Sequence, residues 1–253
     1  MQTISILGCG WLGKALATFF LSENIKVKGS TTTKEKLSIL RHLGIETSII
    51  NIEKNIFEDD FFNCDILIIA ITAKQIEAFK VLHQKIKPHT KVIYISSTSV
   101  YDNNINPVNE TTKINKGRIA QIETVLNTNR KIDLTILRFS GLIGPQRNPA
   151  NFFLKKDFIP NPNGFVNMIH LKDCIGIINA VIKKNAWNEI FNGTAPHHPI
   201  RKEYYSYLRK ENNLPNPMFK ELTKEFKIID GNKVIKELNY QFKFDDLMTI
   251  LDD

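Results

Sequence analysis

The sequence has few cysteines and no long hydrophobic run. Only three cysteines, Cys9, Cys64 and Cys174, occur among 253 residues, and they form neither a Cys-x-x-Cys pair nor a cluster with histidines. Scattered cysteines in odd number exclude a disulfide scaffold and give no sign of a metal site. No apolar run approaches the roughly 20 residues of a transmembrane helix. We therefore expect a reduced, cytoplasmic protein that holds no metal and does not enter a membrane.

A leader segment and a concentrated basic patch are also missing. An apolar strand pattern begins at the third residue, so we expect no signal peptide. The net charge of +8 is compatible with a nucleic-acid partner or an anionic substrate. The lysines, however, are spread along the chain, and no basic run alternates with aromatic residues. We expect a basic surface composition and no nucleic-acid partner, and keep nucleic-acid binding as a third alternative.

A glycine-rich turn near the start of the chain is the most informative stretch. The apolar run 4–7 predicts a buried strand, and Gly8, Gly10 and Gly13 follow it with the spacing G-x-G-x-x-G. Apolar residues at helical spacing then begin with Trp11. Strand, glycine turn and helix in this order are the dinucleotide-binding fingerprint. The alternative is an α/β turn that needs its glycines for packing alone.

Each glycine has its own task in a dinucleotide site. Gly8 permits the tight turn out of the strand, a side chain at Gly10 would block the pyrophosphate, and Gly13 lets the helix pack against the strand. The helix N-terminus offers free N–H groups and a positive dipole end to the phosphates. We therefore predict that this turn binds a dinucleotide.

Strands alternate with helices over the first 140 residues. The run 65–71 is almost wholly apolar, which is typical of a central parallel strand buried on both faces. The alternation predicts an α/β fold, a doubly wound parallel sheet of the Rossmann type with its ligand at the carboxyl edge. Besides the first strand and helix, we expect strands at 25–29, 45–50, 65–71, 91–96 and 133–139 and helices at 34–43, 75–86 and 112–126.

The pattern changes past position 145. The stretch 148–164 is rich in Pro, Asn and Phe, which predicts a loop, and 166–170 can then return to the sheet. We expect a further strand at 189–192 and helices at 171–182, 199–212 and 232–238.

No repeat or linker marks an independent second domain. We expect one unit with a core and a small C-terminal substrate lobe. The core would span about 1–145 and 166–193, and the lobe about 146–165 and 194–253.

Four segments follow the glycine turn in a characteristic order. They are Ser-Ser-Thr-Ser-Val-Tyr at 96–101, Leu-Arg-Phe-Ser-Gly-Leu-Ile-Gly-Pro at 137–145, Val-Asn-Met-Ile-His-Leu-Lys-Asp at 166–173 and Ile-Phe-Asn-Gly at 190–193. In order and spacing, over most of the chain, they resemble the extended short-chain dehydrogenase/reductases, the NAD-dependent epimerase/dehydratase family. The resemblance implies a Rossmann core with bound NAD or NADP and a small-molecule substrate. It is also compatible with a homodimer.

The resemblance also implies roles for individual residues. In that family the second serine of the strand-end motif, here Ser97, polarises the substrate oxygen, and we predict Ser97 and Tyr101 as the catalytic residues. The Gly-Pro segment after Arg138 shapes the nicotinamide pocket, and the segment 169–173 anchors the small lobe. The predicted cofactor-binding residues are Gly8, Gly10, Trp11, Leu12, Gly13, Ser30, Thr31, Thr32, Lys34, Ser96 and Arg138.

One departure from the family concerns its catalytic pair, Tyr-x-x-x-Lys. The lysine lowers the pKa of the tyrosine, so that the phenol exchanges a proton at neutral pH. The equivalent stretch here, 114–123, holds no tyrosine, and the pair occurs at no register of the chain. The chain is therefore similar to an atypical branch without the pair. Lys116 and Arg118 lie there, either near the cofactor or in the exposed first turn of a helix.

A second departure concerns the cofactor. An NAD site usually has an acid about 20 residues past the glycine motif, bound to the ribose hydroxyls. Here that region is Gly-Ser-Thr-Thr-Thr-Lys at 29–34, with no acid before Glu35. Hydroxyls and a lysine can accept a 2′-phosphate, which predicts a preference for NADP over NAD. A Ser/Thr cap on the following helix is compatible with the same residues.

Besides nucleic-acid binding, two functions remain open from the sequence. The first is an NAD(P)-dependent oxidoreductase or epimerase-like enzyme with an altered proton donor, acting on a small polar molecule, with a sugar derivative as the family analogue. The second is a non-catalytic dinucleotide-binding protein, a redox sensor or regulatory partner. The missing Tyr/Lys pair favours the second, and Ser97, Tyr101 and the Gly-Pro segment favour the first.

Overall fold

A computed structural model gives the fold of residues 2–72, 75–128, 131–223 and 226–250. The chain forms two compact units, and each is built from three separate segments. Unit 1 comprises 1–96, 116–137 and 181–190, and unit 2 comprises 97–115, 138–180 and 191–253. The division differs from the predicted core and lobe: residues 97–115, 138–145, 166–180 and 191–193, which the prediction placed in the core, group with the C-terminal part of the chain.

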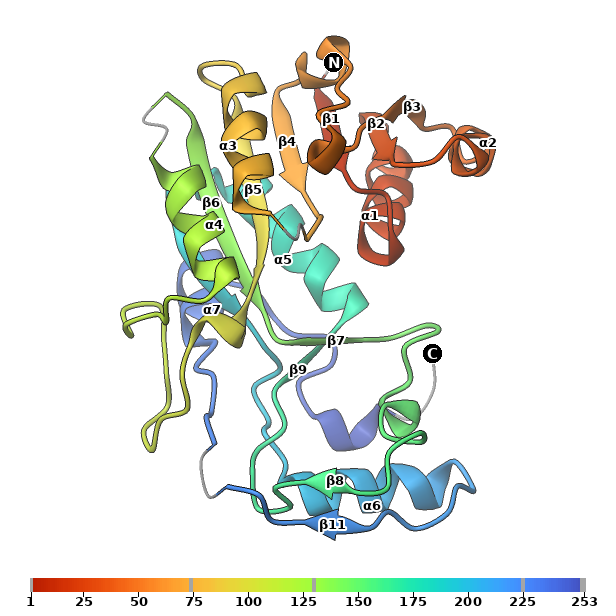
Figure 1. Ribbon diagram of the computed structural model, residues 1–253, viewed down its shortest axis with the longest axis vertical. Coiled ribbons are helices and arrows are strands. Elements are labelled where there is room, and N and C mark those ends of the chain that lie inside the picture. Colours follow the sequence, from red (N-terminus) through yellow and green to blue (C-terminus); the bar gives the residue numbers. More distant parts are fainter. Residues whose placement is uncertain (1, 73–74, 129–130, 224–225, 251–253) are drawn as a thin grey trace. The chain divides into compact units, whose positions relative to one another are not determined.

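The main sheet is parallel and has seven strands in the order β10-β6-β5-β4-β1-β2-β3. Chain order reverses between β1 and β4, so the sheet is doubly wound, as predicted (Figure 1). At such a switch point a crevice opens outside the carboxyl ends of the strands. The strands are β1 Thr3–Leu7, β2 Lys26–Thr31, β3 Glu46–Ile49, β4 Ile66–Ile69, β5 Lys91–Ser97, β6 Asp133–Phe139 and β10 Ile190–Gly193.

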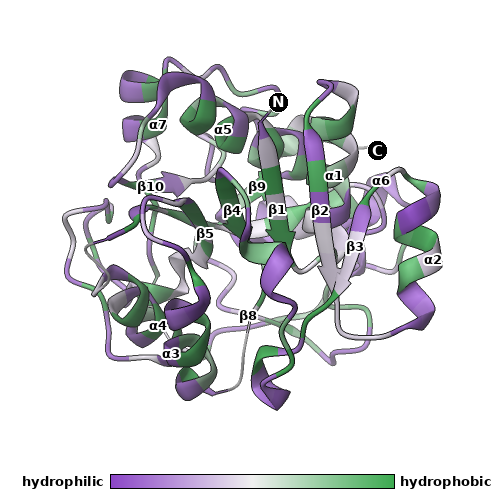
Figure 2. Cartoon of the chain, turned by 90° about the horizontal axis from the view of Figure 1, so that it is seen from above, coloured by the Kyte–Doolittle hydropathy of each residue, from purple (hydrophilic) through white to green (hydrophobic). Residues whose placement is uncertain are grey.

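Helices cover both faces of this sheet. Helices α3 and α4 pack against each other on one face, and α1 packs against β1 and β2 on the other (Figure 2). All four residues of β4 are fully buried, which confirms the central strand expected from the apolar run 65–71. The helices are α1 Trp11–Ser22, α2 Glu35–His42, α3 Ile76–Lys85, α4 Arg118–Asn127, α5 Leu171–Lys184, α6 Arg201–Glu211 and α7 Asn232–Leu238.

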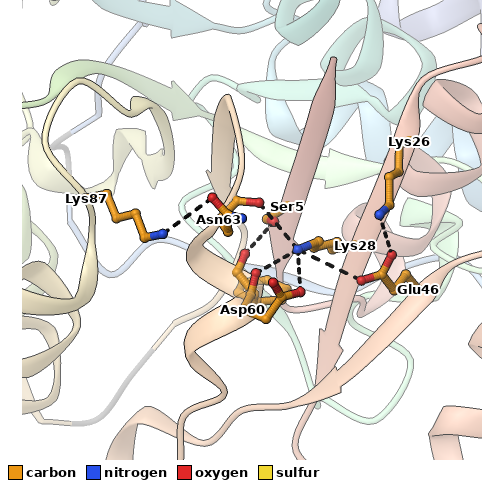
Figure 3. A network of polar contacts seen from close by, with 8 residues as sticks. Ser5, Lys26, Lys28, Glu46, Asp60, Asn63 and Lys87 are labelled. Carbon is orange, nitrogen blue, oxygen red and sulfur yellow. Dashed lines mark hydrogen bonds and ion pairs between the residues drawn. The ribbon is translucent and has the colours of Figure 1, made fainter. Parts of the chain in front are cut away.

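A buried lysine fixes the connection between β3 and β4 in unit 1 (Figure 3). The side chain of Lys28 on β2 is only 6% exposed, and its Nζ donates to the carbonyl oxygens of Asp60 at 2.7 Å and Asn63 at 3.3 Å. The same Nζ pairs with Asp60 Oδ2 at 2.6 Å and lowers the pKa of that carboxyl. Ser5 Oγ donates to the carbonyl of Phe61 at 2.7 Å. The segment 59–63 is thus held by the first two strands.

Unit 2 has its own small sheets and apolar cluster. Strand β7 Gly141–Ile143 pairs with β9 Met168–His170, and β8 Ile159–Pro160 pairs with β11 Phe219–Lys220. The prediction that 166–170 returns to the main sheet is therefore wrong. The register of β9 with β7 places Met168 opposite Gly141. A side chain at position 141 would contact Met168. The cluster includes Val166, Tyr204, Tyr205, Leu208 and Leu247.

Asp173 ties the C-terminal segment to unit 2. It is fully buried in α5, and its carboxylate accepts from Tyr240 Oη at 2.8 Å and from the backbone N–H groups of Lys243 and Phe244 at 2.8 and 3.1 Å. The ring of His170 lies 3.8 Å from that of Phe244. The family resemblance implies that the segment 169–173 anchors the lobe to the core; the contacts described here lie within unit 2.

The fourth helix starts later than predicted, at Arg118 instead of position 112. Asn109 Oδ1 accepts from the backbone N–H of Thr111 at 3.1 Å, and Thr112 Oγ1 accepts from the N–H of Asn109 at 3.0 Å. These side-chain bonds stabilise a turn in competition with the helix. No helix in the described ranges is long and apolar enough to cross a membrane.

Candidate functional site

The three glycines of the turn meet different surroundings in unit 1. Gly8 has φ +100°, and a Cβ there would lie 2.2 Å from Ile71 Cγ2. A Cβ at Gly13 would lie 2.1 Å from the carbonyl oxygen of Gly8. A Cβ at Gly10 meets nothing within 4 Å. Gly8 and Gly13 are therefore required by the fold, whereas the absence of a side chain at Gly10 leaves space that the protein itself does not use.

A pocket of about 370 Å³ opens at this turn. The N-terminus of α1 has no side-chain cap and no acidic residue in its first turn, so its N–H groups and dipole suit an anion. Leu12, predicted to bind the cofactor, is 7% exposed and packs inward, leaving only its backbone for such contact. The lining comprises Leu7, Gly8, Cys9, Gly10, Ser30, Thr31, Thr32, Lys36, Ile50, Asn51, Ile52, Glu53, Ile71 and Thr72.

Ser30 belongs to the frame of the pocket. Its hydroxyl accepts from the N–H of Gly8 at 2.9 Å, its carbonyl accepts from the N–H of Cys9 at 2.8 Å, and it is 1% exposed. It therefore supports the shape of the turn. Burial raises the pKa of the neighbouring Cys9 thiol to about 12, so this sulfur is not a nucleophile at neutral pH.

The residues after β2 differ in their access to the pocket. Thr31 is 8% exposed, and Thr32 is exposed on the lining. Lys36 also lines the pocket, whereas Lys34 is exposed and is not part of the lining. Sequence reasoning missed Lys36 because it falls within a helical pattern. Its place in the first turn of α2, directly after the hydroxyl run, is the signal that could have found it.

The hydroxyl of Ser96 bonds to a buried carboxylate. It is 7% exposed and donates to Glu123 Oε1 at 2.5 Å, within unit 1. Glu123 lies on α4 and is 3% exposed. A buried carboxylate must be hydrogen-bonded, and this serine supplies such a bond. The contact of Ser96 with the cofactor stays a prediction.

Tyr101 and Arg138 enclose each other in unit 2. Tyr101 Oη donates to Asn192 Oδ1 at 2.8 Å and accepts from Arg138 Nη1 at 2.7 Å, and the guanidinium lies 5.1 Å from the tyrosine ring. Tyr101 is 1% exposed and Arg138 is 3% exposed. The two side chains thus satisfy one another's buried polar groups, and the expectation that Tyr101 faces a substrate and Arg138 a cofactor stays a prediction.

Two further ionisable groups surround this phenol cluster, which comprises Tyr101, Arg138 and Asn192. Glu110 accepts from the backbone N–H of Asn192 at 2.7 Å, and burial raises the pKa of its carboxyl. Lys227 Nζ donates to the carbonyl of Tyr101, and burial lowers its pKa. Sequence reasoning missed Asn192, which lies 91 positions from its partner, as a partner of the phenol.

The phenols do not resemble activated proton donors. Burial is the first cause that raises the pKa of Tyr94, Tyr101, Tyr204, Tyr205 and Tyr240, five of the six tyrosines. A catalytic phenol needs a lowered pKa, which a neighbouring cation provides. At Tyr101 the lowering effect of Arg138 is smaller than the effect of burial.

Ser97 and the start of α4 hold the remaining predicted groups. Ser97 is half-buried, and its Oγ accepts from the N–H of Ser99 at 3.1 Å, which leaves its own proton to donate. Asn115 bonds to this turn through its backbone N–H to Val100 and its Nδ2 to Ser99. Lys116 is exposed, in agreement with a solvated helix start. In the described ranges, no three His, Cys, Asp or Glu side chains gather as metal ligands.

No family model matches the chain. Protein YeeZ of Escherichia coli K12 is 31% identical to it, over 97% of both chains. Among solved structures, a conserved protein of unknown function from Silicibacter pomeroyi superposes with a TM-score of 0.81 at 18% identity, covering 99% of this chain and 97% of the other.

Two structures with bound cofactors have the same fold. UDP-glucuronic acid 4-epimerase from Bacillus cereus, in complex with NAD, has a TM-score of 0.78 at 18% identity, covering 99% of this chain and 96% of the epimerase. The human epimerase family protein SDR39U1, with NADPH, has a TM-score of 0.74 at 12% identity, covering 98% and 97%. The chain therefore belongs to the YeeZ family, and its fold is that of the NAD-dependent epimerase/dehydratase group of extended short-chain dehydrogenase/reductases.

Proposed function

We propose that this protein binds a nicotinamide dinucleotide at the glycine turn and acts on a small polar substrate, with a sugar derivative as the family analogue. The observation that carries the proposal is the unused space at Gly10, next to an uncapped helix N-terminus. A pyrophosphate fits there, since it needs backbone N–H donors and close approach to the chain. Neighbours of the same fold bind NAD or NADPH, which supports this choice of ligand.

The residues of the pocket would divide the work between them. Gly10 and the first turn of α1 would hold the phosphates, and Thr32 and Lys36 would lie toward the ribose that carries the 2′-phosphate in NADP. A bound nicotinamide ring supplies a hydride acceptor or donor. In the enzyme proposed here, Ser97 donates its hydroxyl proton to a substrate oxygen and so polarises it, and we assign Tyr101 a positioning role.

A specific observation favours a second function, the non-catalytic redox sensor. Tyr101 is enclosed, its pKa is raised, and the chain has no Tyr-x-x-x-Lys pair. A protein that keeps a dinucleotide site and lacks the family's proton donor is suited to report the state of its cofactor. The two functions share the glycine turn and differ only in turnover.

The test of dinucleotide binding is Gly10→Val. The new side chain would occupy the path of the pyrophosphate without contacting the protein, so we expect NAD(H) and NADP(H) binding to be lost while the melting temperature stays close to that of the parent. Isothermal titration calorimetry measures the binding. A folded Gly10→Val variant with parental affinity would refute the proposal.

A turnover assay separates enzyme from sensor. Hydride transfer is followed at 340 nm against a panel of small alcohols and sugar nucleotides, for the parent and for Ser97→Ala. The enzyme predicts slow turnover that falls in Ser97→Ala with unchanged dinucleotide affinity. Tight binding with no turnover on any substrate favours the sensor.

A further inference from the structure

One buried cation in unit 2 takes no part in the function proposed above. Arg209, on the last turn of α6, is only 6% exposed. Its Nη1 donates to the carbonyl of Pro215 at a long 3.3 Å, and its Nε is buried without a hydrogen-bond partner. Within the described residues, no carboxylate pairs with it.

Such an arrangement is costly for a protein. A guanidinium stays charged and carries five N–H donors. Burying a charge without a partner is unfavourable, so buried charges are normally paired. The carbonyl of Pro215 is one weak, neutral acceptor and does not balance the charge. The fold holds an arginine whose natural partner is an oxyanion.

The backbone that carries Arg209 is held in place. The preceding residue, Leu208, and Tyr205 one turn earlier belong to the apolar cluster of unit 2. The carbonyl of Arg209 accepts from the N–H of Leu214 at 2.8 Å, which closes the loop after the helix. The backbone on both sides of Arg209 is thus fixed, and a planar guanidinium loses little entropy per hydrogen bond that it forms.

The helix end that carries Arg209 contacts the chain three positions past the Gly-Pro segment of unit 2. Asn212 Oδ1 accepts from Asn148 Nδ2 at 3.0 Å, and Asn148 follows Pro145 by three positions. The family resemblance assigns the Gly-Pro segment to the nicotinamide pocket. An anionic group held by Arg209 would belong to a molecule bound in unit 2 close to that segment.

We propose that Arg209 is the receptor for an oxyanion, a carboxylate or a phosphate, carried by the small-molecule ligand of unit 2. The identification of that ligand as the substrate rests on the proposed function, whereas the anion site does not. A planar guanidinium matches both carboxylate and phosphate by two parallel N–H···O bonds.

The test uses the full chain without dinucleotide, at fixed ionic strength set with chloride. Inorganic phosphate and acetate are titrated separately, and thermal unfolding and calorimetry are followed. We expect one of the two anions to raise the melting temperature saturably by about 2–4 °C. Arg209→Gln should weaken its binding by about tenfold or more, and Arg209→Lys by less. Lys210→Gln, which removes an exposed charge from the next position, should bind as the parent does.

Two further variants identify the site. Gly10→Val should leave the effect of the anion on the melting temperature unchanged, because we place the anion at Arg209 and not at the glycine turn. This expectation holds even if the dinucleotide proposal fails. Asp252 and Asp253 lie outside the described residues, and the double change to Asn should leave anion binding unchanged. Equal binding by parent and Arg209→Gln, no effect beyond that of chloride, or anion binding that appears only in the double Asn variant would each overturn the proposal.

Discussion

The glycine turn of unit 1 and the phenol cluster of unit 2 differ in the space and the polar groups that they leave open. At the turn, space is left open at Gly10, and the helix N-terminus has no side-chain cap. In the cluster, Tyr101, Asn192 and Arg138 bond to one another in the interior. The turn leaves space for a ligand, whereas the polar groups of the cluster already bond to one another.

The largest effect is expected from Gly13→Ala, which tests whether the open turn depends on the close packing of Gly13 against the backbone of Gly8. A Cβ would lie 2.1 Å from a backbone oxygen that cannot move aside. We expect a loss of about 3 kcal/mol in the free energy of unfolding, measured by urea denaturation. Gly10→Ala is the matched control and should change stability by about 0.5 kcal/mol at most. Equal losses in the two variants would contradict the comparison.

The next effect concerns the closed cluster. Tyr101→Phe keeps the ring but leaves Asn192 Oδ1 buried without the phenol donor and removes the bond from Arg138. We expect destabilisation by about 2 kcal/mol, with unchanged dinucleotide affinity. Tyr207→Phe, at a half-exposed position on α6, serves as the control with little effect. A stable Tyr101→Phe variant with lost turnover would mean that the phenol is catalytic after all.

The next prediction concerns the preference of the open turn for NADPH over NADH. Thr32 and Lys36 line the pocket, and no acid precedes Glu35 in the stretch after β2. A charge-assisted hydrogen bond to the 2′-phosphate of NADP is worth about 1.5–3 kcal/mol, so NADPH should bind about tenfold more tightly than NADH. Lys36→Met should remove most of that ratio, and Lys34→Met should remove less. Tighter binding of NADH by the parent would refute the preference.

The smallest expected effect is on the pH dependence of stability, through the pair of Lys28 and Asp60 in unit 1. Lys28 lowers the pKa of the Asp60 carboxyl. The stabilisation is therefore present above the ordinary carboxyl value of 3.8 and is lost as pH falls through the lower folded value. Lys28→Met should flatten the fall in stability below about pH 4. Lys80→Met, which breaks only an exposed pair with Glu77, should leave the slope unchanged.

Sequence reasoning located the parts of the fold that depend on local pattern. The apolar run at β4 and the spacing of the three glycines predicted a central strand and a turn that the structure contains. The strand 166–170 was misplaced because a short apolar segment pairs equally well with a main sheet or with a single neighbour, and only tertiary contacts decide.

The candidate site was harder to predict than the fold. Ser96 and Ser97 are adjacent and of the same type, yet one hydroxyl is bonded to Glu123 and the other is half-buried near the surface. The partner of Tyr101 lies 91 positions away. Which hydroxyl remains for a ligand depends on which one a distant residue occupies, and no local pattern records that.

The interleaving of the two units has a consequence for biosynthesis. The last segment of unit 1 spans residues 181–190, and unit 2 includes residues up to the C-terminus. A ribosome delivers the chain from its N-terminus, so unit 1 lacks its last segment until most of the chain has been made. No contiguous fragment contains one unit without parts of the other. Gene truncations at 96 or 137 should therefore yield insoluble or protease-sensitive products, whereas circular permutants that keep all segments have what each unit needs to fold.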